Sequence, residues 1–164
     1  MVALVAALVI APWAQPVRFR PLPAWQTGAS GTLASSYGPV PGVTVPKEST
    51  AWIARGVRYR DRPSADPPNA TLSHLPRQGI VVFVSVYESA APRGSPIDLR
   101  LGHARRYPCC DGTYVPGGVY ELAGAGPAAA YSVIVRVYYG SPPTSWMRAQ
   151  AQHALKQLVL PPPR

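Results

Sequence analysis

Acidic residues are scarce in this sequence, and charge as a whole is low. Charged side chains make up 14% of the 164 residues, whereas about 25% is usual for a globular chain. The chain holds 7 acidic against 16 basic residues, for a net charge of +9, and its only lysines are Lys47 and Lys156. Two explanations of this basicity are open. One is the arginine usage typical of a GC-rich genome, and the other is attraction to an anionic partner such as nucleic acid, lipid headgroups or a wall polymer.

The N-terminal apolar run is too short for a comfortable membrane span. It covers residues 2–14 of "MVALVAALVIAPWAQP", whereas a spanning helix needs about 20 residues and a signal-peptide core about 7–15. No basic residue precedes the run, and Arg18 and Arg20 follow it, which works against export by the positive-inside rule. A buried first strand or helix is the alternative. We predict a signal peptide or membrane anchor over residues 1–15 and an extracytoplasmic protein, secreted or membrane-anchored.

Only two cysteines are present, Cys109 and Cys110, and they are adjacent in "YPCCDG". This spacing does not match the C-x-x-C of redox sites or the spaced pairs of zinc sites, although His103 and Asp111 could complete four ligands. In an oxidising compartment the two cysteines could form a disulfide that rigidifies the turn. Two free thiols are the alternative. The pair Cys109 and Cys110 is therefore a candidate disulfide with a structural role.

The motifs of common enzyme classes are absent. The sequence has no G-x-S-x-G, no P-loop, no dinucleotide fingerprint and no H-E-x-x-H. Its histidines, His74, His103 and His153, are far apart, and its acids form no pair suited to metal binding or acid–base work. We predict no catalytic residue, no metal ligand and no cofactor. A small enzyme or redox protein using Cys109 and Cys110 is the least favoured reading.

Proline and glycine punctuate the chain without forming a single tract. The 21 prolines and 14 glycines lie between apolar runs, which indicates loops in a folded domain rather than disorder. The length suits one domain. We predict a linker over residues 16–23, "PVRFRPLP", a single domain over residues 24–160, and a tail over residues 161–164.

Two segments give strong strand signals. Residues 80–87, "IVVFVSVY", are β-branched or aromatic and apolar on both faces, which is typical of a central strand with both faces covered. Residues 131–139, "YSVIVRVYY", alternate, so the odd-numbered side chains share one face. Residues 118–123 predict a further strand. Because the intervening turns are too short for crossover helices, we expect a mainly antiparallel sheet.

Three further segments carry weaker strand patterns. Residues 25–37 suggest a strand or hairpin, and residues 97–103, "IDLRLGH", suggest a strand near a sheet edge. Residues 51–59 predict a strand in which Ile53, Val57 and Tyr59 share one face, with Gly56 as a bulge.

The C-terminal segment predicts one helix packed on the sheet. Thr144 or Ser145 can cap its N terminus, and the prolines at 161–163 would stop it. Polar side chains, such as Gln152, fall on the opposite face. An apolar stripe at helical spacing would face the sheet, formed by Met147, Ala151, Ala154, Leu155 and Leu158.

The order of these elements resembles a known group of proteins. A signal-like start is followed by "LPAW", by "LPRQGIVVFVSVY", and by the closing "YSVIVRVYYGSPPTSWMRAQAQHALKQL". This order is similar to small exported proteins of unassigned function from high-GC bacteria, whose layout resembles the PsbP-like α/β/α sandwich. The resemblance covers residues 25–160 in pattern, without a diagnostic motif. It implies assembly or binding roles rather than one conserved reaction, and it implies no functional residue.

One basic stretch, "RGVRYRDR", is a candidate anion contact. Arg58, Arg60 and Arg62 would project from one side of a strand, with Tyr59 opposite. An aromatic and basic sheet face can bind single-stranded nucleic acid, but the aromatic ring points away from the arginines and no RNP-like motif is present. A solvated strand end is the favoured reading of this stretch.

These observations favour an exported or membrane-tethered, non-catalytic α+β domain that binds a protein partner or an envelope component. A basic protein that binds nucleic acid or another polyanion is the alternative. The N-terminal segment is the candidate contact with a membrane.

Overall fold

A computed structural model describes residues 16–29, 48–62, 68–87, 94–108, 115–129 and 131–162. In chain order, the helices and strands of these residues are β1 (Arg18–Phe19), β2 (Trp25–Ala29), β3 (Glu48–Arg55), α1 (Asn69–Leu72), β4 (Ile80–Tyr87), β5 (Arg105–Tyr107), β6 (Val119–Ala125), β7 (Ser132–Tyr139), α2 (Ser145–Leu155) and β8 (Leu158–Val159).

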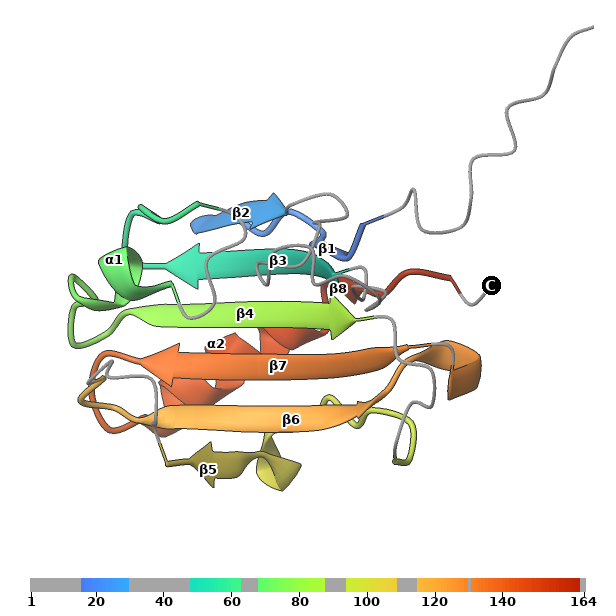
Figure 1. The fold of residues 1–164 in the computed structure, drawn as a ribbon. Coiled ribbons are helices and arrows are strands. Elements are labelled where there is room, and N and C mark those ends of the chain that lie inside the picture. The colour runs from blue at the N-terminus through green and yellow to red at the C-terminus, as the bar shows by residue number, and fades with distance from the viewer. Residues whose placement is uncertain are drawn as a thin grey trace, which may run out of the picture.

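The strands form one large sheet and one small sheet. The large sheet has six strands in the order β2-β3-β4-β7-β6-β5, and every neighbouring pair is antiparallel. The small sheet pairs β1 with β8. Figure 1 shows α2 lying behind β4 and β7. The predicted α+β class, with a mainly antiparallel sheet packed against a C-terminal helix, is confirmed; the PsbP-like label is not.

β4 is the central strand that the sequence predicted. It pairs with β3 along one edge and β7 along the other, and every residue before Tyr87 is buried. Its two faces enter different cores: Val82 and Val84 join the larger core, whereas Val81 and Phe83 join a smaller core on the opposite face. Side chains alternate between the two faces of a strand, so an apolar run of this length is buried on both.

β7 confirms the predicted alternation. Val133, Val135, Val137 and Tyr139 lie in the larger core, together with Tyr131 just before the strand. Burial raises the pKa values of Tyr131 and Tyr139 to about 12. Both phenols therefore remain neutral at physiological pH, as the apolar core requires.

α2 begins as predicted and ends earlier than the prolines at 161–163 suggested. The Oγ1 atom of Thr144 accepts a hydrogen bond of 3.2 Å from the backbone N–H of Met147. The helix presents Met147, Ala151, Ala154 and Leu155 to the larger core. The prediction that Leu158 continues this helical stripe is wrong, because Leu158 belongs to β8 and pairs with Phe19.

The segment expected to be a linker, residues 16–23, contributes to the fold. Val17 and Phe19 are buried in the larger core, and the backbone N–H of Val17 donates to Ser49 Oγ at 3.1 Å. The alternating "VRFR" turns its apolar members inward and Arg18 and Arg20 outward. Two apolar residues and a pairing partner at β8 are enough to bring this stretch into the domain.

The first residue of the expected tail is also packed. Pro161 is buried, and its carbonyl oxygen accepts a hydrogen bond of 2.5 Å from the Tyr131 hydroxyl. The packed unit therefore extends beyond residues 24–160 at both ends.

Two details of the strand predictions are wrong. Residues 97–103 form an irregular segment that ends in a 3₁₀ turn, Leu101–His103, and the edge strand is β5 instead. β3 ends at Arg55, and Gly56 has a φ of +72°, a conformation that glycine adopts readily. The chain changes direction there, so Ile53 faces the larger core while Val57 and Tyr59 pack against the smaller one.

In the part of the chain that the structure describes, no helix is both long and apolar enough to cross a membrane.

Candidate functional site

The outer edge of β6 is only partly covered by neighbouring chain. β5 pairs with residues 119–121. At the other end, the backbone N–H of Ala125 donates to the Ser95 carbonyl at 3.0 Å, and the Ile97 N–H donates to the Ala125 carbonyl at 2.9 Å. Residues 122–124 lie between these two covered stretches.

A pocket of about 600 Å³ opens at this gap. Its lining combines residues 121–124 of β6, all of β5 and the segment before β5. The residues that line it include Ser95, Pro96, Asp98, His103, Arg105, Arg106, Tyr107, Glu121, Leu122, Ala123 and Gly124.

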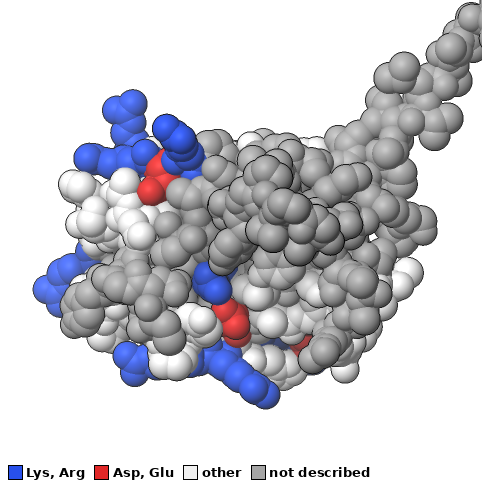
Figure 2. Space-filling model, viewed as in Figure 1, with Lys and Arg blue, Asp and Glu red and all other residues white. Residues whose placement is uncertain are grey.

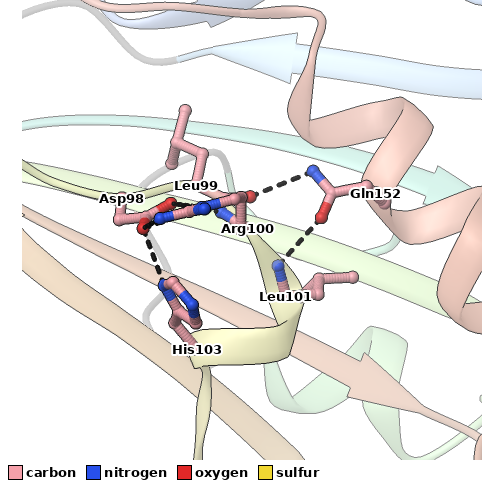
Figure 3. A network of polar contacts seen from close by, with 6 residues as sticks. All are labelled: Asp98, Leu99, Arg100, Leu101, His103 and Gln152. Carbon is pink, nitrogen blue, oxygen red and sulfur yellow. Dashed lines mark hydrogen bonds and ion pairs between the residues drawn. The ribbon is translucent and has the colours of Figure 1, made fainter.

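The irregular segment beside the pocket is fixed to α2 by one side chain. Gln152 Nε2 donates to the Leu99 carbonyl at 3.0 Å, and Gln152 Oε1 accepts from the Leu101 N–H at 2.8 Å (Figure 3). Leu99 and Leu101 also pack against the larger core. Gln152, which the sequence placed on the polar face of the helix, thus holds the wall of the pocket.

Close backbone contact holds the same segment against β6. A Cβ atom on Gly124 would lie 2.7 Å from the Ile97 Cα, a separation that no real side chain tolerates. Glycine at position 124 therefore allows Ile97 to lie directly on the strand next to the pocket.

Asp98 is the centre of a polar network in this wall (Figure 3). Its carboxylate accepts hydrogen bonds from the Arg100 guanidinium, at 2.6 Å from Nη2, and from the Arg100 backbone N–H at 3.0 Å. It also contacts His103 Nδ1 at 2.7 Å. The hydrogen bonds from the Arg100 side chain and backbone, followed by the contact with His103, hold the pKa of Asp98 far below its ordinary value.

The Asp98 network shapes the segment more than it stabilises the fold. Arg100 and His103 are exposed and Asp98 is partly exposed, and ion pairs at the surface contribute only about 0–1 kcal/mol. The hydrogen bonds between Asp98 and Arg100 close a tight turn where the alternating sequence had suggested a strand. They also pair the negative charge of Asp98, which lines the pocket, with the Arg100 guanidinium.

Glu121, the second carboxylate in the described lining of the pocket, also forms an ion pair. Glu121 Oε2 accepts a hydrogen bond of 3.0 Å from Arg136 Nε on the neighbouring strand β7. The Arg136 guanidinium also lies 5.1 Å from the centre of the Tyr107 ring, a favourable cation–π distance.

Arg105 and Arg106 remain as cations without a paired carboxylate among the described residues. Both lie on the edge strand β5 and are exposed. Arg105 is opposite Glu121 in register, but Glu121 is paired with Arg136. Successive side chains point to opposite faces of a strand, so the two guanidinium groups flank the sheet edge. This arrangement gives the pocket an excess of positive charge.

The charges and hydrogen-bonding groups of the pocket suit the binding of an anion. The described side chains offer His103 no hydrogen-bonding partner other than Asp98. Among the residues with a described position, no group of three His, Cys, Asp or Glu side chains could hold a metal ion. The pocket can bind an anionic group through charge and hydrogen bonds.

The predicted anion contact, Arg58, Arg60 and Arg62, lies elsewhere. All three side chains are exposed in the segment that follows β3, which is four inter-strand spacings of about 4.8 Å, or roughly 19 Å, from β5. Figure 2 shows the coloured basic side chains in separate groups rather than one continuous stripe. The structure does not bring these arginines to the pocket, and their role as an anion contact stays a prediction.

Packing around this arginine segment gives it a structural explanation. Tyr59 stacks on Trp52 with a centroid distance of 3.6 Å and an interplanar angle of 4°. Asp61 accepts hydrogen bonds from the backbone N–H groups of Ala70 and Thr71, at 2.9 and 2.7 Å, at the start of α1. The alternating pattern therefore follows from Tyr59 and Asp61 facing the domain while the arginines face solvent.

The predictions for the cysteine pair and for the N-terminal apolar run concern residues that the structure does not describe. Cys109, Cys110 and residues 1–15 lie outside the described residues. The candidate disulfide and the signal peptide or anchor stay predictions.

Sequence reasoning did not single out Arg105, Arg106 or the gap beside them. The adjacent arginines of "HARRYP" were the available signal. Arg58, Arg60 and Arg62 carry an equally strong basic pattern, and only the strand pairing distinguishes the two stretches.

No family model matches this chain, and neither does any curated protein or solved structure.

Replacing Gln152 should loosen the pocket wall without unfolding the domain. Gln152→Ala removes two hydrogen bonds, each with a net contribution of about 0.5–1.5 kcal/mol. We expect the Leu101 amide to exchange with solvent about tenfold faster or more, as measured by hydrogen–deuterium exchange. Gln150→Ala is the matched control on the same helix. Unchanged exchange at Leu101 would contradict the anchoring role of Gln152.

Proposed function

We propose that this chain is a non-catalytic binding domain that recognises an anionic group of a protein or envelope partner in the pocket beside β5. One observation carries this proposal. Asp98 and Glu121, the carboxylates that line the pocket, are paired internally, whereas Arg105 and Arg106 on the same lining have no ion-pair partner among the described residues. An incoming anion would supply the missing partner, and arginine hydrogen bonds to carboxylates or phosphates are among the strongest in proteins.

The distribution of charge favours a single anionic group over a nucleic acid. A polyanion gains affinity from many phosphate contacts along a basic surface. Here Arg105 and Arg106 lie roughly 19 Å across the sheet from the segment with Arg58, Arg60 and Arg62. The pocket of about 600 Å³ matches the size of a small ligand or a few residues of a partner. A protein or envelope component is therefore the favoured partner, and a polyanion is the alternative.

An extracytoplasmic location is part of the same proposal. It is supported by the apolar run of residues 2–14, whose length is that of a signal-peptide core. Expression of the full chain followed by fractionation and intact mass measurement tests it. We expect the product outside the cytoplasm, either shortened by about 15 residues or bound to the membrane. A full-length product confined to the cytosol would contradict this location and favour polyanion binding.

Removal of both pocket arginines should abolish most anion binding. The probe is a fluorescein-labelled acidic pentapeptide, and binding is measured by fluorescence anisotropy at low salt. For Arg105→Gln combined with Arg106→Gln, we expect the affinity to fall about fivefold or more, because each exposed ion pair contributes up to about 1 kcal/mol. Arg18→Gln combined with Arg20→Gln changes the net charge equally, in and directly after β1, and should leave the affinity nearly unchanged.

Two results would contradict the pocket as the binding site. Equal losses in both double variants would show that the probe senses only net charge. Tighter binding of a single-stranded oligonucleotide would support the polyanion alternative if it weakened steeply with salt and depended on Arg58, Arg60 and Arg62.

A further inference from the structure

The backbone of Ala123 provides an unused hydrogen-bonding pair in the pocket. In an antiparallel strand, the N–H and C=O groups of alternate residues point to the same edge. Ala125 directs both groups to the outer edge, where Ser95 and Ile97 bond to them, so Ala123 directs its own groups outward as well. Among the described residues, Ala123 has no backbone partner at that edge, because β5 reaches only to Glu121.

The length of the gap limits what can pair with Ala123. Chain covers the edge on both sides, with β5 opposite residues 119–121 and Ser95 and Ile97 at Ala125. An extended peptide lying along the edge would collide with both neighbours. The end of a peptide needs to place only one residue in the gap, so a chain terminus fits where a continuous strand does not.

The charge of the lining selects the C-terminal end. Arg105 and Arg106 line the same pocket as Ala123, and their charges suit a carboxylate rather than an ammonium group. Capture of a terminal carboxylate by backbone N–H groups and addition of a short strand to a sheet edge are both established modes of peptide recognition.

We propose that the pocket binds the C-terminal residue of a partner peptide whose preceding residues turn away from the sheet edge. The Ala123 N–H donates to one oxygen of the terminal carboxylate, and the Ala123 carbonyl accepts from the N–H of the last peptide residue. Arg105, which pairs with Glu121 in strand register and shares the Ala123 face of the sheet, binds the same carboxylate, whereas Arg106 lies on the opposite face and adds positive charge to the pocket. Pro96, opposite Ala125 on the same face as Ala123, contributes apolar lining for the last side chain. This inference rests on the proposed function and names the group that the pocket recognises.

Paired peptides test the terminal carboxylate directly. The probes are a labelled pentapeptide with neutral side chains and a free C terminus, and the same peptide with a C-terminal amide. Anisotropy titration of the full domain should show the free acid binding about tenfold or more tightly than the amide, since charged hydrogen bonds contribute about 1.5–3 kcal/mol. A third peptide, amidated and with one internal glutamate, distinguishes a terminal carboxylate from a side-chain carboxylate.

The backbone contact has its own test in the unaltered protein. Titration with the free-acid peptide should shift the ¹H–¹⁵N signal of the Ala123 amide, and the amidated peptide should not. Ala123→Pro removes this donor at an edge position that tolerates proline, and Ala123→Ser retains it. We expect weaker binding of the free acid by Ala123→Pro only, with both variants checked for an unchanged melting temperature.

The outcomes separate this inference from the proposed function. Equal binding of the acid and the amide, or a stationary Ala123 signal while binding depends on Arg105 and Arg106, would overturn terminal-carboxylate recognition and leave the anion-binding pocket intact. If the internal-glutamate peptide bound more tightly than the free-acid peptide, this would also overturn terminal-carboxylate recognition and leave the anion-binding pocket intact. If the unaltered domain bound none of these peptides, including the acidic pentapeptide, both the terminal-carboxylate inference and the proposed anion-binding function would be overturned.

Discussion

Burial of one apolar sheet face beneath α2 is the interaction on which the rest of this structure depends. Met147 and Leu155 of the helix lie in the same core as Ile53, Val82 and Val135 of the sheet. Each such side chain contributes about 1.5–3 kcal/mol when it is fully buried, whereas an isolated helix of this length would be marginal in water. The docked helix then positions Gln152, which holds the pocket wall. The pocket is therefore a consequence of how the core packs.

The parts of the fold that could be predicted are those with a long periodic pattern. The apolar run of β4, the alternation of β7 and the stripe of α2 each repeat over enough residues to identify both the element and its buried face. The short strands could not be predicted this way, because β1 and β8 gain their stability from pairing with each other. Residues 97–103 alternate like a strand, but the Asp98 carboxylate binds the Arg100 backbone and turns the chain.

The candidate site was harder to predict because it depends on which strands pair and where the pairing stops. Its defining feature is the stretch of β6 between β5 and the contact of Ser95 and Ile97 with Ala125, and no local sequence pattern marks where an edge is left open. The composition gave a partial indication of the site. Because acidic residues are far fewer than basic ones, some arginines must lack an acidic partner. The sequence could not say which arginines, because Asp98 and Glu121 are paired by tertiary contacts. The basic stretch that was identified, Arg58 to Arg62, owes its alternation to Tyr59 and Asp61 facing inward.

The most direct test of this account is the free energy of unfolding of Leu155→Ala, measured by urea denaturation. Leu155 is almost fully buried between α2 and the sheet, and truncation of a buried leucine in a packed core costs about 2–5 kcal/mol. The exposed His153→Ala on the same helix is the control, with an expected change within about 0.5 kcal/mol. A loss of 2 kcal/mol or more for Leu155→Ala alone is the predicted result. Equal and small effects from both variants would show that the sheet does not depend on the helix.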